Sequence, residues 1–385
     1  MPNSLPSQDI RQRDSAIRIG VDMGGSDLKF GATNLAGDQV LVDELVKRSS
    51  LTQGGPQKTI AQTLDGIAEV MQKTNTQWAN IADIAVTVPC PCSADGVIIE
   101  ATNIGTAETK ELWKVPFGEH LAEAVKQASG ESIPVFCCND ANAAGQDDDF
   151  ARFGLSSDNR SSVFITTGTG LGGCVMADGH VVFGLGQAGE LGHVKPTIPV
   201  RYAARFADDP HPRCGCGAVD CVEARASLKG LVRRIEWALS EAGADVIRQQ
   251  LAADGRTLND ETLTRLRELA TRGPEQAAYN VRTFADRDED AFCRWLLEDW
   301  AIMIGALFAS LAPVLHPNLF IIGGGMTEMS PAARDWFIEV VRRVYGEVNS
   351  QSCFASRTGN CEIVWSKSQD QGWRGAILMA IRSGR

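Results

Sequence analysis

A glycine-containing hairpin pattern occurs twice in the chain, at residues 17–38 and 162–179. In each copy an apolar strand is followed by a glycine-containing turn, a second strand and another turn, and glycine or aspartate marks the turns. A glycine of the second strand and a glycine of the next turn stand six residues apart in both copies: Gly31 with Gly37, and Gly173 with Gly179. The spacing predicts an internal duplication that starts two similar domains.

The remaining pattern predicts an α/β protein of two domains, which the length of 385 residues also favours. Further strands are expected at 39–46, 84–88, 134–137, 319–322 and 361–365. Helices are expected at 59–74, 141–152, 222–240, 259–271, 288–315, 331–345 and 371–381. We expect a flexible tail at 1–16, a first domain at 17–138 that the C-terminal helix at 371–385 joins, and a second domain at 139–370.

Three glycines of the second copy, Gly168, Gly170 and Gly173, match the G-x-G-x-x-G pattern of dinucleotide-binding loops. That fingerprint needs a helix after the glycines, because the helix N-terminus binds the pyrophosphate. Here a strand, a turn and another strand follow. The sequence therefore argues against a nicotinamide or flavin cofactor.

A glycine-rich β-turn binds phosphate in another way, since backbone N–H groups reach the oxygens where no Cβ intervenes. Asp22 ends the first strand, where its carboxylate suits a hydrated magnesium ion. The alternative is two ordinary tight hairpins, and Lys29 is either a phosphate ligand or a solvated strand lysine. The candidate residues for ATP and magnesium are Asp22, Gly24, Gly25, Ser26, Lys29, Thr167, Gly168, Thr169 and Gly170.

Asn139 and Asp140 follow an apolar strand and precede a helix-forming segment. Both residue types are favoured at helix N-termini, where they satisfy free N–H groups, so capping alone explains them. A carboxylate at a strand end also lies where α/β proteins bind ligands, and it can accept a proton from a hydroxyl. The residues by themselves leave both interpretations open.

His193 and three cysteines, Cys214, Cys216 and Cys221, form a set with the C-x-C-x4-C spacing. One imidazole and three thiolates suit a closed tetrahedral zinc site, which is structural because no ligand position stays open. The alternative is that the thiols are small buried apolar groups. We expect the cysteines at 90, 92, 137 and 138 to lie in the core.

The net charge is −11, from 37 basic and 48 acidic residues. This balance argues against nucleic acid or an anionic membrane as the main partner. We expect no membrane span, because no apolar run approaches the length of one, and the polar N-terminus lacks the apolar segment of a signal peptide. Eleven cysteines suggest a reducing compartment, so we expect a cytoplasmic protein.

Five segments together resemble the motifs of the ROK family of bacterial-type sugar kinases and related repressors. They are, in chain order, 22–29 (DMGGSDLK), 139–144 (NDANAA), 167–170 (TGTG), 190–193 (ELGH) and 214–221 (CGCGAVDC). The resemblance implies the two-domain actin-like ATPase (ribonuclease H-like) fold with a central cleft. It also implies an ATP-dependent hexose kinase that forms a homodimer.

The resemblance assigns roles to single residues. It implies that Asp140 is the catalytic base and that Asn139 bonds a neighbouring sugar hydroxyl. The residues at 323–325 resemble the adenosine-side loop, which includes Gly324. The resemblance also implies sugar binding by Asn103, Glu190, Glu223 and His193. For Glu223 the alternative is a glutamate in the first turn of a helix, which the helix dipole favours.

Two positions depart from the family pattern: Asp220 and Cys90 stand where glycine is usual, and the segment from Asn103 to Trp113 is longer. These departures leave the choice of sugar open among glucose, N-acetylmannosamine, another amino sugar and fructose. A sugar-responsive transcriptional repressor is the rival class. It needs a helix-turn-helix domain before the first strand, where the sequence has about sixteen residues.

Overall fold

The computed structural model describes residues 16–101, 103–155, 160–207, 211–350, 361–368 and 372–384. The chain forms two compact units, with boundaries after Asn159, Gly173, Gly189 and Ser366. The first unit holds the N-terminal segment, residues 174–189 and the C-terminal helix. The expected tail at 1–16 lies, except for Ala16, outside the described residues.

The first unit contains a five-stranded sheet with the order β3-β2-β1-β4-β5. β2 is antiparallel to β1 and β3, whereas β4 is parallel to β1 and β5. The strand expected at 39–46 is wrong: only a single bridge joins Val40 to Thr33, and the strand forms later. The strands are β1 (Ile17–Met23), β2 (Asp27–Asn34), β3 (Val46–Ser49), β4 (Ile81–Val88) and β5 (Val135–Asn139).

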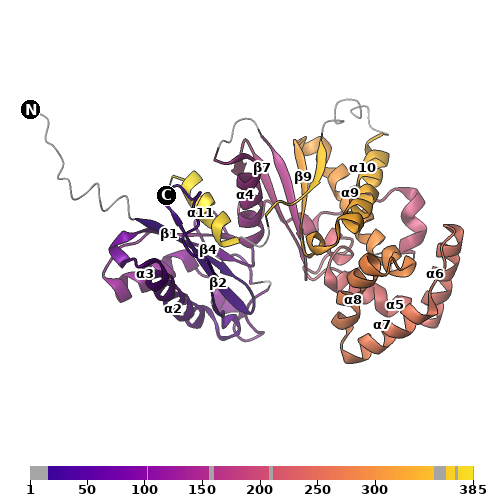
Figure 1. Ribbon diagram of the computed structural model, residues 1–385, viewed down its shortest axis with the longest axis horizontal. Helices are drawn as coiled ribbons and strands as arrows, with labels where there is room; N and C mark the ends of the chain where they lie inside the picture. Colours follow the sequence, from indigo (N-terminus) through magenta and orange to yellow (C-terminus); the bar gives the residue numbers. More distant parts are fainter. Residues whose placement is uncertain are drawn as a thin grey trace, which may run out of the picture. The chain divides into compact units, whose positions relative to one another are not determined.

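Helices cover both faces of this sheet (Figure 1). Along β4, Ile84 and Val86 pack in the apolar cluster that includes α2 and α3, whereas Ala85 packs in the cluster that includes α4 and α11. Successive side chains of a strand point to opposite faces, so β4 is buried on both sides. The helices are α2 (Pro56–Thr74), α3 (Phe117–Ser129), α4 (Asp140–Phe153) and α11 (Gly372–Arg382).

α11 rests on the sheet through two glycines that face each other across β1 and β2. Gly20 and Gly31 are register partners. A Cβ at Gly20 would lie 2.2 Å from the carbonyl oxygen of Trp373, and one at Gly31 would lie 2.6 Å from its indole ring. The absence of side chains at these two positions therefore lets the buried Trp373 pack directly against the strands.

The second sheet has the order β10-β9-β6-β7-β8. Read from β8, this is the order of the first sheet, with β6 in the place of β1 and β9 in the place of β4. β9 is parallel to both β6 and β10, as β4 is to β1 and β5. The strands are β6 (Ser162–Thr167), β7 (Leu171–Ala177), β8 (His180–Val181), β9 (Leu319–Gly324) and β10 (Glu362–Trp365).

The other helices all lie in the second unit. The helix expected at 222–240 begins only at Leu228, after a separate 3-10 turn, and α3, α6 and α8 were not expected. The helices are α5 (Leu228–Ala238), α6 (Glu241–Ala253), α7 (Asp260–Arg272), α8 (Pro274–Arg287), α9 (Ala291–Leu315) and α10 (Pro331–Ser350). The short 3-10 helices of the chain are η1 (Thr52–Gly54), η2 (Trp78–Asn80), η3 (Lys110–Trp113), η4 (Leu191–His193), η5 (Val200–Phe206), η6 (Val222–Ala224) and η7 (Gly325–Glu328).

α9 is long and apolar enough to cross a membrane by length and composition alone. A helix was expected here, at 288–315, but not an apolar run of this length, because Arg294, Glu298 and Asp299 interrupt its first turns. Of its most apolar window, 83% is buried inside the protein, where it packs on α8 and α10. Its burial makes it a core helix of the second unit.

Three consecutive aspartates of α4, Asp147, Asp148 and Asp149, are almost fully buried. Asp147 pairs with Arg374, and Asp149 accepts a hydrogen bond of 3.2 Å from Arg382. Asp148 accepts hydrogen bonds of 2.6 Å from Arg152 and from the backbone N–H of Lys367. All three carboxylates therefore pair with donors, and the pairs and bonds with residues after 366 tie the C-terminal segment to α4.

Arg374→Met is expected to destabilise the protein, because it leaves the buried Asp147 carboxylate without its ion partner. Breaking such a pair costs about 3 kcal/mol of unfolding free energy, and replacing both partners by apolar residues restores much of it. Urea unfolding of Arg374→Met and of Asp147→Leu/Arg374→Met measures both effects. Arg248→Met, which removes an exposed pair with Asp245, is the control and should leave the midpoint unchanged. A midpoint for Arg374→Met equal to that of the control would contradict the structural role of the pair.

Candidate active site

In the first unit, polar side chains gather at the carboxyl ends of three neighbouring parallel strands. Asp22 of β1 is the register partner of Thr87 on β4, and Thr87 is the partner of Cys138 on β5. The Asp22 Oδ1 atom accepts a hydrogen bond of 2.8 Å from the Thr87 hydroxyl. This edge of an α/β sheet is where ligands bind. Thr87 was missed from the sequence, since a threonine in an apolar strand carries no separate signal.

Hydrogen bonds to neighbouring residues hold the glycine turn after β1. Gly24 N–H donates to the Asp27 carbonyl at 2.8 Å, and the Gly25 carbonyl accepts from the hydroxyls of Ser50 and Thr52 at 2.8 and 2.7 Å. Ser26 is exposed on the turn. Three hydrogen bonds therefore fix the backbone of the turn, one through the Gly24 N–H and two through the Gly25 carbonyl.

Lys29 lies opposite Asp22 on β2, with its Nζ 4.0 Å from the Asp22 Oδ2 atom. About a quarter of the lysine side chain is exposed. This position makes Lys29 an ion partner of Asp22 rather than a fully solvated residue, and it stays a candidate phosphate ligand.

Asn139 caps α4 and Asp140 is its first residue. Asn139 Oδ1 accepts the Asn142 N–H at 3.1 Å, while its Nδ2 donates to the Cys90 carbonyl and to Asp140 Oδ1 at 3.3 and 3.1 Å. Asp140 Oδ1 also accepts the Ala141 N–H at 2.8 Å. Capping is therefore present, and it orients the half-buried Asp140 carboxylate. A sugar contact of Asn139 stays a prediction.

Asn103 is exposed and donates through Nδ2 to the Pro89 carbonyl at 3.1 Å. Its own carbonyl oxygen lies near Gly25, 3.6 Å from where a Cβ would stand. The structure thus brings Asn103 beside the first glycine turn and beside the segment that accepts the Asn139 amide. Its role in sugar binding stays a prediction.

Cys138 lies near the two candidate carboxylates of this unit, Asp22 and Asp140. It is fully buried, and both Asp140 and Asp22 are close enough to act on it electrostatically. Burial is the main cause that raises the pKa of its thiol well above the usual value. Cys90, Cys92 and Cys137 are buried as well, so the expectation that these cysteines lie in the core is confirmed.

In the second unit, the glycine turn between β6 and β7 lies beside the glycine segment at the end of β9. Thr167 and Gly324 are register partners, and a Cβ at Gly324 would lie 2.3 Å from the Thr167 carbonyl oxygen. The Thr167 side chain is buried and donates to the Gly323 carbonyl at 3.4 Å. Gly168 and Thr169 are exposed, so of the two threonine hydroxyls only that of Thr169 lies on the surface of the turn.

Glu223 links three loops of this unit. Its Oε2 accepts the Leu171 N–H at 3.0 Å, and its Oε1 lies 3.4 Å from Cys214 Sγ. It belongs to η6 rather than to a long helix, so the expected helix-dipole explanation does not apply. Glu190 lies close enough to Glu223 for the two charges to interact. Burial raises the pKa of Glu190, while the charge of His193 opposes the rise.

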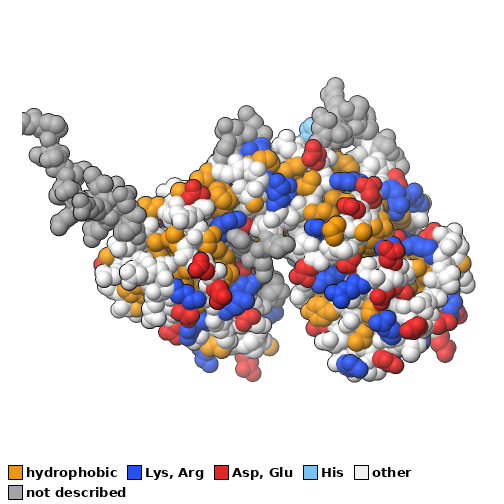
Figure 2. All heavy atoms as spheres, in the orientation of Figure 1, with side chains coloured by type: hydrophobic (Ala, Val, Ile, Leu, Met, Phe, Trp, Pro, Cys, Tyr) orange, Lys and Arg blue, Asp and Glu red, His pale blue; other side chains and the backbone are white. Residues whose placement is uncertain are grey.

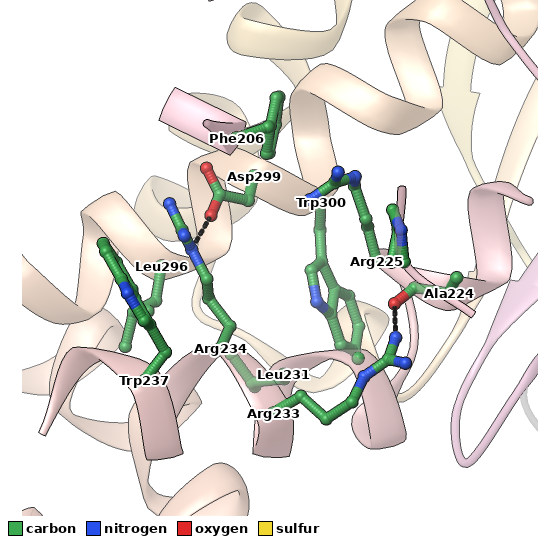
Figure 3. Close-up of a pocket in the computed structure, with 12 residues that line it drawn as sticks. Phe206, Ala224, Arg225, Leu231, Arg233, Arg234, Trp237, Leu296, Asp299 and Trp300 are labelled. Atoms are coloured by element: carbon green, nitrogen blue, oxygen red, sulfur yellow. Dashed lines mark hydrogen bonds and ion pairs between the residues drawn. The ribbon is translucent and has the colours of Figure 1, made fainter. Parts of the chain in front are cut away.

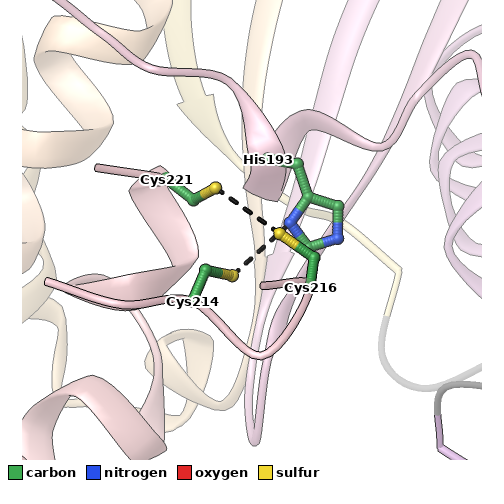
Figure 4. A group of neighbouring side chains, drawn as sticks. All are labelled: His193, Cys214, Cys216 and Cys221. Atoms are coloured by element: carbon green, nitrogen blue, oxygen red, sulfur yellow. Dashed lines mark hydrogen bonds between the residues drawn. The ribbon is translucent and has the colours of Figure 1, made fainter. Parts of the chain in front are cut away.

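His193, Cys214, Cys216 and Cys221 present ligand atoms within 4.8 Å of one another (Figure 4). Cys214 Sγ lies 3.6 Å from His193 Nδ1, and Cys216 Sγ lies 3.7 Å from Cys221 Sγ. Tetrahedral zinc, with bonds of about 2.3 Å to sulfur and about 2.0 Å to nitrogen, separates its ligands by about 3.8 Å (sulfur–sulfur) and about 3.5 Å (sulfur–nitrogen). The four residues therefore fit the group that the sequence predicts.

His193 turns its other ring nitrogen toward Glu190, at 4.0 Å from Nε2 to Oε2. With Nδ1 on a metal, Nε2 carries the proton and is a donor. A polar ligand beside Glu190 would meet this donor.

Asp220 adopts a left-handed backbone conformation, with φ of 65°, at the position where glycine is usual. Its carboxylate oxygens lie 3.1 and 3.2 Å from His211 Nδ1, and its N–H donates to the Pro212 carbonyl at 3.0 Å. These contacts offset the strain that a non-glycine residue brings to such a position. The departure from the pattern therefore leaves the cysteine loop intact.

A cavity of about 220 Å³ is lined by Ala224 of η6 and by residues of α5 and α9 (Figure 3). In it Arg234 donates to Asp299 at 2.9 Å, while Arg233 donates to the carbonyls of Ala224 and Arg213. Arg233 thereby holds the residue that follows Glu223. The face in Figure 2 shows basic and acidic side chains intermixed over the helical region of this unit.

The chain belongs to the ROK family, whose pattern matches residues 18–383. It is 29% identical over 315 residues to a glucokinase of Halalkalibacterium halodurans, covering 80% of each chain. It is 26% identical over 318 residues to an N-acetyl-D-glucosamine kinase of Histophilus somni, covering 80% of this chain and 83% of that one.

Solved structures share the fold. A ROK glucokinase from Streptomyces griseus in complex with glucose and AMPPNP matches with a TM-score of 0.64 at 22% identity, over 95% of this chain and 99% of that one. A ROK transcriptional regulator, a homologue of the E. coli MLC protein, matches with a TM-score of 0.66 at 22% identity, over 95% and 78%. The fold is therefore the actin-like ATPase fold of the ROK sugar kinases, as expected from the motifs.

The ligand geometry predicts about one zinc ion per chain by elemental analysis, and close to none in Cys216→Ser, because three ligands hold the ion much less tightly than four. Cys361→Ser, outside the cluster, is the matched control and should keep its metal. Full zinc occupancy in Cys216→Ser would contradict the assignment of this residue as a ligand.

Proposed function

We propose that this protein is an ATP-dependent sugar kinase that transfers the γ-phosphoryl group of ATP to a hydroxyl of a hexose, with Asp140 as the general base. The observation that carries the proposal is the oriented carboxylate of Asp140, at the strand edge that also holds Asp22. Membership of the ROK family and the likeness to kinases of glucose and N-acetylglucosamine support it.

The proposed reaction needs a base because a sugar hydroxyl is a weak nucleophile. Asp140 accepts the proton of that hydroxyl while its oxygen bonds to the γ-phosphorus and ADP leaves. Two N–H donors hold Asp140 Oδ1, from Ala141 and from the Asn139 side chain, so the carboxylate is oriented before the substrate arrives. The proton therefore has a fixed acceptor.

We assign the nucleotide to the two glycine turns. The turns with Gly24, Gly25 and Ser26 in one unit and with Thr167–Gly170 in the other would offer backbone N–H groups to phosphate oxygens. The N–H groups of Gly24 and Gly168 are excepted, because they already donate to the carbonyls of Asp27 and Gly170. Gly324 lies beside Thr167, which suits the adenosine side of the same nucleotide. Asp22 would hold magnesium, whose charge neutralises the phosphates during transfer.

We assign the sugar to Asn103, Asn139, Glu190, Glu223 and His193. Paired carboxylates suit a neutral polyol, since each accepts hydrogen bonds from adjacent hydroxyls. Zinc on His193 and the three cysteines would fix the loop that carries Glu190 and Glu223, and with four protein ligands it has no open position for catalysis. A cytoplasmic homodimer that acts on sugar and ATP, without nucleic acid or membrane, belongs to the same proposal.

Glucose is our first substrate, and N-acetylmannosamine, another amino sugar and fructose are the alternatives. The kinases of glucose and N-acetylglucosamine among the relatives favour glucose or an N-acetylhexosamine over fructose. An ADP-coupled assay over a panel of hexoses and amino sugars identifies the substrate. No turnover with any of them would reject the kinase.

A sugar-responsive transcriptional repressor is the second candidate, favoured by the likeness to the ROK regulator. Both candidates bind a sugar, but only the kinase consumes ATP in proportion to the sugar. The same assay therefore separates them.

Asp140→Asn is expected to lower kcat by about 100- to 10,000-fold, because the amide cannot accept the proton. The amide oxygen still accepts the Ala141 N–H, so sugar affinity should change little. Steady-state kinetics and calorimetric titration with the sugar measure the two effects. Asp43→Asn, an exposed acid, is the control. Near-normal turnover of Asp140→Asn would rule out this residue as the base.

A further inference from the structure

We infer that Glu223 is a positioning residue that links the sugar-binding groups of the second unit to its phosphate-binding turn, so that a bound sugar tightens the binding of the nucleotide. The inference rests on the proposed function and deepens it, because it assigns Glu223 a second task beyond contact with the sugar. All the groups involved belong to the second unit.

The first observation is a direct bond. Glu223 Oε2 accepts the N–H of Leu171 at 3.0 Å, and Leu171 follows the last glycine of the turn. The backbone of Glu223 is itself anchored, because Val222 N–H donates to the Val194 carbonyl at 3.0 Å and Arg233 donates to the Ala224 carbonyl. A carboxylate on a fixed backbone thus holds one end of the turn.

The second observation is that the same segment holds the other end of the turn. Leu228, at the start of α5, donates its N–H to the Gly168 carbonyl at 2.9 Å. Residues 223–228 therefore clamp the turn at Gly168 and at Leu171. A change in the position of the Glu223 side chain is therefore expected to shift the backbone of this turn.

The third observation is the close packing that two glycines allow. A Cβ at Gly170 would lie 2.6 Å from Glu223 Oε2. A Cβ at Gly192, in the loop of Glu190 and His193, would lie 2.2 Å from the Leu171 carbonyl oxygen. The three loops therefore touch one another at Glu223 with no space for a side chain at either glycine.

A carboxylate has about four acceptor sites, so Glu223 can bond a sugar hydroxyl while it keeps the Leu171 N–H. A sugar hydroxyl bound to Glu223 restricts the rotamers of that side chain. Because the same carboxylate accepts the Leu171 N–H, the position of this N–H is restricted as well. A nucleotide that meets an ordered turn loses less conformational entropy on binding, which is positive coupling between the two ligands. Glu190 offers the matched contrast, since among the described residues it makes no hydrogen bond to the turn.

The test measures the affinity of the zinc-loaded full chain for magnesium–AMPPNP by calorimetry, with and without saturating glucose, and again with N-acetyl-D-glucosamine. We expect the better sugar to tighten AMPPNP binding by about fivefold or more, the lower end of typical coupling. Glu223→Ala should reduce this ratio to about one, because it removes the acceptor for Leu171. Gly170→Ala, which displaces the same oxygen, should reduce it as well.

The controls separate coupling from sugar affinity and from folding. Glu190→Ala should weaken sugar binding but keep the ratio of AMPPNP affinities with and without sugar, once the sugar is saturating. Glu223→Gln should keep part of this ratio, because its amide oxygen accepts the Leu171 N–H. Zinc content shows that each variant is folded around its metal. An unchanged ratio in Glu223→Ala, or an equal loss in Glu190→Ala, overturns the inference.

The outcome for coupling is distinguishable from that for the proposed function. If the wild-type chain phosphorylates a sugar but binds AMPPNP equally with and without it, the kinase stands and the link is wrong. If sugar tightens AMPPNP binding through Glu223 while no phosphorylated sugar forms, the link stands and the proposed reaction is wrong.

Discussion

The packing of α11 on the first sheet is the constraint on which the first unit depends. Trp373 fits only because Gly20 and Gly31 stand opposite each other, and the buried aspartates of α4 pair with arginines of α11. The same helix reaches the candidate site, since a Cβ at Gly372 would lie 2.7 Å from Asp22 Oδ1. Burying an unpaired carboxylate is costly, so the C-terminal segment completes the first unit instead of extending the second.

The residues of the candidate site in the second unit are fixed in a different way. Its candidate groups lie on short 3-10 turns and loops rather than on long helices, so regular backbone hydrogen bonding fixes few of them. Three features hold these loops instead: the close contacts at Gly170 and Gly192, the hydrogen bond of the Glu223 carboxylate, and the cluster of His193 with three cysteines. A zinc ion at these four side chains would join residues that are distant in the chain and so close the loop.

The duplication and the clustering of His193 with three cysteines could be predicted, because each follows from a local pattern, a glycine spacing or a cysteine spacing. The acidic run at 147–149 could not, since three consecutive aspartates usually mark a solvated surface, and two of their arginine partners lie more than 200 residues further along the chain. The burial of the Thr167 side chain was not predicted either. Thr167 is still part of β6, whereas the glycine pattern indicates that the turn begins there. The hydrogen bond from Leu171 to Glu223 could not be predicted, because its donor is a backbone N–H, which almost every residue type has.

The two key carboxylates are each held by backbone N–H groups, Asp140 by Ala141 and Glu223 by Leu171. Groups fixed in this way need no rearrangement as charge develops in a reaction. The departures from the family pattern affect side chains next to these fixed points. Cys90 bonds Asn139 through its carbonyl, which a change from glycine leaves in place, and Asp220 keeps the cysteine loop closed. Substitutions at such positions change side chains near the proposed sugar site without displacing Asp140, the proposed base. Under the proposed function, the choice of sugar can therefore change while the reaction stays the same.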